Sequence, residues 1–207
     1  MRLDRQFEQH KSALLKICEQ VFSHGRVLQG PEVDALENQL CEIMGTKRAI
    51  AVGSATDALF FALISAGVSK GDRVAVPAMT FVATVSPIIR AGAIPVFVDA
   101  RLDSQPDTEQ IINLVESGNI EAVVAAHLYG QMFDITPIVR ACKTNDVLFI
   151  EDAAQAIGAT FNGSSPGKLS SAATVSFDPM KVAGAFGSGG AVVTNDDNIA
   201  DRVHRLR

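Results

Sequence analysis

The chain has 207 residues, 47% of them hydrophobic, and a formal net charge of −5. A chain of this length and apolar content can bury a substantial core, which argues against a disordered protein. The acidic balance and the lack of a dense basic run with interleaved aromatics argue against a nucleic-acid partner.

Cysteines and the N-terminus suggest the compartment. Cys18, Cys41 and Cys142 are odd in number and widely spaced, so neither a disulfide framework nor a metal site is predicted. The N-terminus is charged, and the longest apolar run, 58–68, is shorter than the about 20 residues that cross a bilayer. We therefore expect a soluble, cytoplasmic protein without a membrane partner.

In chain order, the first predicted element is a helix over 3–24, expected to pack on the outside of the domain. A second helix follows over 31–45, where Pro31 suits a first turn and Gly45 suits a C-terminal cap. Further helices are predicted for 56–67, for 134–146 and for the last residues of the chain. Short β-branched runs predict strands between them: 48–53, 72–78, 94–99, 122–127, 147–152, 173–177 and 190–195.

These elements indicate the fold class. Strands that are apolar along their whole length and alternate with helices indicate an α/β fold with a mainly parallel sheet of about seven strands. Helices would cover both faces of the sheet, giving a three-layer α/β/α sandwich. No repeat or flexible linker divides the chain, so one domain is expected.

In such sheets, ligands bind at the carboxyl ends of the strands. The first notable end is GSATDAL (53–59), where a strand turns directly into a helix. Free N–H groups there, with the hydroxyls of Ser54 and Thr56, would suit a phosphate. Ordinary helix capping by either hydroxyl residue is the alternative.

The second end is VLFIEDAAQA (147–156), an apolar strand that finishes in Glu151 and Asp152. A carboxylate at the end of a buried strand needs a cation or strong hydrogen-bond donors nearby. A helix cap or an ion pair explains such a residue as well as a catalytic role does.

The third is SFDPMKVAGAFGSGG (176–190), where Lys181 stands among apolar residues and glycines. Such surroundings disfavour the ammonium form and favour the amine that attacks a carbonyl. A solvated surface lysine is the plain alternative.

Together, a phosphate cradle, a buried acid and an amine nucleophile are what pyridoxal phosphate requires. The motifs QGPEVDALENQL, EDAAQAIGA and SFDPMKVAGAFGSGGAVVTND, in this order, resemble the DegT/DnrJ/EryC1/StrS family of sugar aminotransferases. Members are pyridoxal-phosphate enzymes of fold type I. The similarity begins near residue 25 and runs to the end of the chain.

The resemblance implies a role for each matching residue. Lys181 and Asp152 would be catalytic: Lys181 would form the Schiff base with the cofactor, and Asp152 would pair with its ring nitrogen. The phosphate of the cofactor would be held by Ser54, Ala55, Thr56 and Ser176. The two faces of its ring would be covered by Phe81 and Ala154, and its phenolic oxygen would be contacted by Gln155.

The resemblance also implies the reaction and the partners. An amino donor, glutamate, would supply the amino group, and a nucleotide-linked keto-sugar would accept it, within a homodimer. Residues 1–24 would form an N-terminal helical segment and 25–207 the large cofactor-binding domain. The smaller C-terminal domain of the family is absent from this sequence.

Some positions differ from the family pattern. Members commonly carry an aromatic residue at Asp178, Thr or Ser at Met180, an acid at Ser188 and Gly at Ala55. These changes and the length keep a second hypothesis open, a non-catalytic or truncated protein that serves as a binding or assembly partner.

Two further functions and the role of His127 are left as alternatives. A sugar dehydratase of the same family is one, although some of those enzymes have histidine where Lys181 stands. A Rossmann nucleotide binder lacks its glycine-rich signature here, because 53–58 contains one glycine. In HLYGQ (127–131), which also resembles a family segment, a structural role for His127 is as plausible as a site role, so it is left out of the catalytic set.

Overall fold

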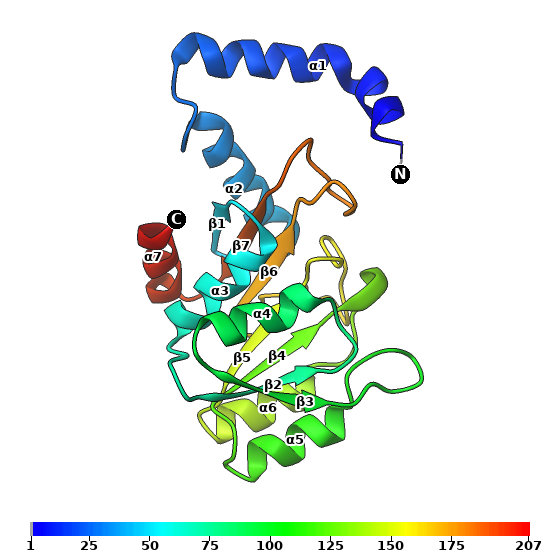
Figure 1. Cartoon of the computed structure of the whole chain (residues 1–207), viewed down its shortest axis with the longest axis vertical. Coiled ribbons are helices and arrows are strands. Elements are labelled where there is room, and N and C mark those ends of the chain that lie inside the picture. The colour runs from blue at the N-terminus through cyan, green and yellow to red at the C-terminus, as the bar shows by residue number, and fades with distance from the viewer. Residues whose placement is uncertain (1) are drawn as a thin grey trace.

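A computed structural model describes residues 2–207 and forms a three-layer α/β/α sandwich (Figure 1). Seven strands make one sheet in the order β1-β7-β6-β5-β4-β2-β3. The strands are β1 Arg48–Val52, β2 Arg73–Pro77, β3 Ile94–Val98, β4 Ala122–Ala126, β5 Leu148–Asp152, β6 Ala172–Ser176 and β7 Gly190–Thr194. The fold class predicted from the sequence is confirmed.

Strand direction decides which ends meet. The pairs β2–β3, β2–β4, β4–β5 and β5–β6 are parallel, whereas β7 runs antiparallel to both β1 and β6. The start of β7 therefore lies at the same edge of the sheet as the carboxyl ends of the other strands. The register pairs Val52 with Gly190 and Ser176 with Gly190.

Two sets of helices cover the sheet. On one face, α3 Ala55–Ala66, α4 Val82–Arg90 and α7 Asp197–Leu206 bury one apolar cluster. On the other face, α5 Thr108–Glu116 and α6 Thr136–Thr144 bury a second cluster, and α2 Pro31–Met44 a third. Successive residues of a strand point to opposite faces of the sheet, so Val74 and Val76 pack in the first cluster and Ala75 in the second.

Local sequence explains why the helices begin and end where they do. Pro31 occupies the first turn of α2, and Gly45 ends it in a left-handed conformation with φ 62°. The side chain of Ser54 caps α3 by accepting a hydrogen bond from the N–H of Asp57. Asp107 and Asp196 cap α5 and α7 in the same way.

The N-terminal helix α1, Leu3–His24, differs in its packing from the expectation. It begins and ends where the sequence predicts, but none of its residues is buried, and Figure 1 shows it lying apart from the three layers. Its contacts with the remainder include Phe7, whose ring meets that of Phe186 edge-on at 6.1 Å between centroids, and His24, whose Nε2 is 3.2 Å from Glu32 Oε1 of α2. No helix within residues 2–207 combines the length and apolar character needed to cross a membrane.

Candidate active site

A cavity of about 490 Å³ opens at the carboxyl edge of the sheet. Its walls come from the segments after β1, β2, β4, β5 and β6, five regions far apart in the sequence. Every site residue predicted from the sequence lines it: Ser54, Ala55, Thr56, Phe81, Asp152, Ala154, Gln155, Ser176 and Lys181. The structure therefore brings the whole predicted set together.

Asp152 is the last residue of β5, and hydrogen bonds hold both of its carboxylate oxygens. Thr84 of α4 donates its hydroxyl to Oδ2 at 2.7 Å, and the backbone N–H of Ala154 donates to Oδ1 at 3.1 Å. The hydroxyl of Thr84 is in turn 2.7 Å from that of Thr80. These contacts fix the carboxylate at the floor of the cavity and leave lone pairs for a further donor.

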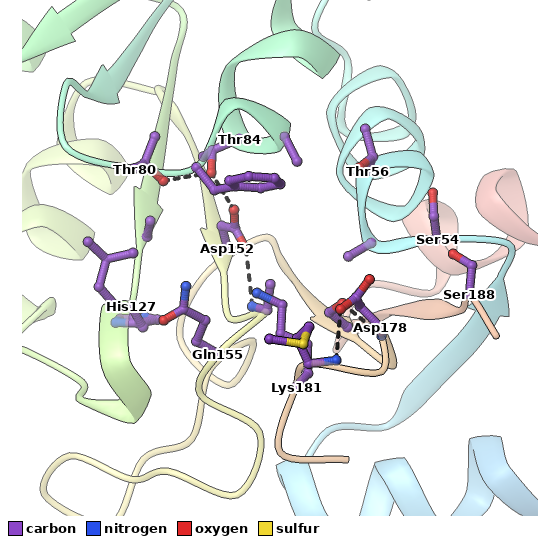
Figure 2. A pocket seen from close by; sticks show the side chains of 18 of the residues that line it. Ser54, Thr56, Thr80, Thr84, His127, Asp152, Gln155, Asp178, Lys181 and Ser188 are labelled. Atoms are coloured by element: carbon purple, nitrogen blue, oxygen red, sulfur yellow. Dashed lines mark hydrogen bonds between the residues drawn. The ribbon is translucent and has the colours of Figure 1, made fainter. Parts of the chain in front are cut away.

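Lys181 lies in the segment 177–190, which folds back on itself. Its backbone N–H donates to the carbonyl of Asp178 at 2.8 Å, and the N–H of Ala185 donates to the carbonyl of Phe177 at 2.8 Å. Gly184 is required here, because a Cβ on it would lie 2.7 Å from the carbonyl oxygen of Pro179. Figure 2 shows the Lys181 side chain extending from this segment toward the end of β5, where Asp152 lies.

The surroundings of Lys181 are less enclosed than the sequence suggests. Lys181 is half-buried, and its apolar neighbours Met180 and Val182 are largely exposed. The lysine therefore stands at the cavity wall rather than in a closed apolar core. Asp178 and Ser188, two of the positions that differ from the family pattern, also line the cavity.

The opposite end of the cavity is the start of α3. Ser54 both caps this helix and donates its hydroxyl to Asp57 Oδ2 at 2.9 Å, so the capping alternative holds. The N–H groups of Ala55 and Thr56, in the first turn, have no acceptor within the helix. They are suited to an anion, with the buried Ser176 also lining this cavity.

Gly190 allows this cradle to form. A Cβ on Gly190 would lie 2.5 Å from the backbone nitrogen of Ala55 and 2.6 Å from the carbonyl carbon of Ser54. Only a residue without a side chain lets β7 approach the start of α3 so closely.

A carboxylate beside the cradle is neutralised by an arginine. The Arg90 guanidinium donates to Asp57 at 2.7 Å and, with the Ser54 hydroxyl, holds the pKa of Asp57 below its usual value. Arg90 also stacks on the ring of Phe60, 3.9 Å from its centroid. The ion pair offsets the repulsion that Asp57 would exert on a phosphate.

The remaining predicted residues flank the middle of the cavity. Phe81 precedes α4, and 65% of its surface is exposed, so its ring is free to stack on a flat ligand. Gln155 is oriented by the backbone N–H of Tyr129, which donates to its Oε1 at 2.8 Å. Ala154 lines the same cavity.

Two contacts at this cavity are not predicted by the sequence analysis. Thr84 holds Asp152, but no motif marks a helix residue 68 positions away in sequence as its partner. His127 lines the cavity and pairs with Glu151, the carboxylate for which the sequence demands a partner. The only sequence signal for this pair is that His127 directly follows one buried strand and Glu151 lies near the end of the next strand.

The sequence of this chain is similar to those of known proteins. The sequence profile of the DegT/DnrJ/EryC1/StrS aminotransferase family matches residues 8–207. The chain is 40% identical over 209 residues to a pleiotropic regulatory protein of Geobacillus stearothermophilus, covering 99% of this chain and 55% of that protein. It is 36% identical over 202 residues to the dTDP-3-amino-3,4,6-trideoxy-alpha-D-glucose transaminase of Micromonospora megalomicea subsp. nigra, covering 98% and 54%.

The fold is similar to that of a solved structure as well. DesV of S. venezuelae, in complex with a ketimine intermediate, superposes with a TM-score of 0.92 at 35% identity, covering 99% of this chain and 55% of that one. The chain spans about half the length of the curated relatives it matches.

Proposed function

Because this chain belongs to the DegT/DnrJ/EryC1/StrS aminotransferase family, we propose that it is the cofactor-binding part of a pyridoxal-phosphate-dependent sugar aminotransferase. The observation that carries the proposal is the convergence of Lys181, Asp152 and the start of α3 on one cavity. An amine, a fixed carboxylate and a helix N-terminus match the three polar ends of pyridoxal phosphate.

The cavity fits this cofactor, which the family uses. The first N–H groups of α3, with Ser54 and Ser176, would take the phosphate, and Gly190 keeps the cradle open to it. Phe81 and Ala154 would flank the ring, and Gln155 would hold its phenolic oxygen. When bound, pyridoxal phosphate supplies a reactive carbonyl carbon and an electron-accepting ring.

The residues of the chain would then have distinct tasks. Lys181 would hold the cofactor through its Nζ and, once released, move the proton that amino transfer requires. Asp152, fixed by Thr84 and the N–H of Ala154, would hold a proton on the ring nitrogen.

The substrates follow from the relatives. The transaminase of Micromonospora megalomicea subsp. nigra is named for a dTDP-linked amino-sugar. We propose that a nucleotide-linked keto-sugar accepts the amino group and that glutamate donates it. The product would be an amino-sugar nucleotide for polysaccharide or glycosylated-metabolite synthesis.

The assembly and compartment remain part of the proposal. We propose a cytoplasmic homodimer in which residues 25–207 form the cofactor-binding unit and 1–24 a helical arm. Large apolar side chains are exposed around the cavity, near the end of α1 and on the segment after it, in numbers that favour coverage by a partner subunit: Phe22, Val27, Leu28, Phe81, Val82, Tyr129, Met180 and Val182.

The test is a chemical label. The purified chain is mixed with pyridoxal phosphate and reduced with borohydride, which converts a lysine–cofactor bond into a stable amine, and the labelled peptide is mapped by mass spectrometry. We expect a single label on Lys181. The Lys181→Ala variant should lose it, whereas Lys168→Ala, which removes an exposed lysine outside the cavity, should keep it.

Other outcomes would favour the alternatives. Labels scattered over surface lysines would contradict the cofactor site and favour a non-catalytic partner, a role that suits the relative named as a regulatory protein. A specific label with no amino transfer from glutamate to a keto-sugar, but loss of a sugar hydroxyl, would favour a dehydratase.

A further inference from the structure

Two buried ionisable residues are neighbours at the cavity wall: His127, after β4, is among the lining residues, and Glu151, within β5, lies behind it. Their side chains are 0% exposed, and His127 Nε2 is 2.6 Å from Glu151 Oε2. The other oxygen of Glu151 accepts from the N–H of Gly167 at 2.8 Å and from the hydroxyl of Ser170 at 2.6 Å. A buried carboxylate is tolerated only with such donors, so this network has a single stable arrangement.

The network is joined to the residues that face the cavity. Glu151 and Asp152 are neighbours on one strand, so their side chains point to opposite faces of the sheet. The backbone N–H of His127 donates to the carbonyl of Asp152 at 3.0 Å. Fixing His127 and Glu151 from behind therefore fixes the backbone that carries Asp152.

The same network reaches Gln155 through the short helix η1, Leu128–Gly130. Tyr129, the middle residue of η1, donates its N–H to Gln155 Oε1, and its own backbone is left-handed with φ 58°. A non-glycine residue keeps this conformation only when its surroundings hold it. His127 directly precedes this segment, and both its ring and its backbone N–H are hydrogen-bonded to β5.

The tautomer follows from the contact. Because Glu151 Oε2 is an acceptor, His127 carries a hydrogen on Nε2, an assignment made from the hydrogen-bond partners. Nδ1 is buried and finds no partner among residues 2–207. The ring of Phe133, 5.2 Å away between centroids, restricts the imidazole on another side.

We propose that His127 and Glu151 are positioning residues, which act through the backbone of β5 and the segment 127–130 to set Asp152 and Gln155 for the cofactor ring. This inference rests on the proposed function, because it assumes that a cofactor binds in the cavity. The hydrogen bonds that connect His127 and Glu151 to the backbone around Asp152 and Gln155 do not depend on that assumption. Neither residue needs to touch the reacting atoms.

The first test needs no cofactor. Amide hydrogen exchange is followed by NMR in the full chain at Tyr129 and Ala154, whose N–H groups report on Gln155 and Asp152. In His127→Phe, which keeps an aromatic ring but cannot donate to Glu151, we expect exchange at both amides to rise about tenfold relative to the buried strand residue Val192.

Matched variants separate positioning from general loss of stability. His127→Gln retains an N–H donor and should restore protection, whereas Ile150→Val, which loosens the core of the same strand, should change all amides together. Should His127→Phe fail to fold, Glu151→Gln is measured in the same way. Unchanged exchange at Tyr129 and Ala154 in the folded variant would overturn the proposal.

The second test uses pyridoxal phosphate. We expect His127→Phe to bind it at least about fivefold more weakly and with an altered visible absorption band, and His127→Gln to recover most of the affinity. Equal affinity and an identical band in His127→Phe would also contradict the proposal. A wild-type chain that binds no cofactor would overturn the proposed function, while the exchange experiment would still decide the positioning role.

Discussion

Gly190 shows how one missing side chain shapes the site. The chain must bring the start of β7 against the start of α3, and the backbone atoms of Ser54 and Ala55 occupy the space of a Cβ. The glycine-rich sequence around Lys181 suggests close approach of some kind, but only the tertiary structure identifies the partner. Gly187, three residues earlier, has nothing within 4 Å of its Cβ position.

We predict that Gly190→Ala lowers the free energy of unfolding by about 1–3 kcal/mol, because the new methyl group displaces the start of α3. It should also weaken binding of pyridoxal phosphate, since the displaced N–H groups form the cradle. Urea unfolding and a cofactor titration measure the two effects. Gly187→Ala is the matched control and should change neither; equal behaviour of the two variants would contradict the packing argument.

The hydrogen bond between Thr84 and Asp152 is a contact that sequence patterns do not predict. The strand end identifies the acid, and a carboxylate that is partly buried there needs a hydrogen-bond donor. That the donor is the hydroxyl of Thr84 depends on how α4 crosses the end of β5. A hydroxyl on a helix has no fixed spacing to a strand elsewhere in the chain, so no sequence rule selects it.

At the scale of elements, the ends of the strands agree with the predictions to within one residue. Two helices, α4 and α5, are not predicted from the sequence. In α4, β-branched residues and the interior Pro87 lower helix propensity. The helix forms because Thr84, Pro87 and Ile88 are buried against its neighbours. In α5, the cap at Asp107 is the signal that could have identified it.

The first turn of α3 leads to a pH prediction. The Arg90 guanidinium holds the pKa of Asp57 below its ordinary value of 3.8. The folded pKa is lowered, so the stabilisation is present above pH 3.8 and is lost as pH falls through the folded pKa.

We therefore expect Asp57→Asn to be less stable than wild type at pH 7, by about 0.2–1 kcal/mol because the pair is partly exposed. The difference should shrink to zero below the folded pKa. Urea unfolding of both proteins, from pH 7 down through the acidic range in which Asp57 takes up its proton, measures it. A difference that persists unchanged at the lowest pH would show that the Arg90 contact is not its source.

For the whole molecule, burial separates three cysteines that look alike in sequence. Cys18 is exposed on α1, Cys41 is partly buried on α2, and Cys142 is buried on α6. Burial raises the pKa of the Cys142 thiol to about 12. Since this folded pKa is above the ordinary value of 9.0, the associated stability is present below pH 9 and is lost as pH rises toward 12.

We expect a thiol reagent at pH 8 to modify Cys18 at once and Cys142 only when the fold opens, because the thiolate is the reactive form. The rate at Cys142 should rise with urea in parallel with unfolding. Peptide mapping at timed intervals gives both rates. If Cys142 is modified as fast as Cys18 in the absence of urea, the thiol of Cys142 is not buried on α6 as the structure shows.

The sequence by itself determined the strands, most helices, the α/β class and the set of residues that meet at the cavity and that we propose carry its chemistry. It could do so because periodicity, caps and strand ends are local properties, and because ligands gather where parallel strands end. Tertiary structure alone decided that β7 runs antiparallel and places Gly190 at Ala55, that Thr84 holds Asp152 and that His127 meets Glu151 behind the cavity. Each of these contacts joins residues far apart in the chain, where distance is set by packing of the layers and not by spacing along the sequence.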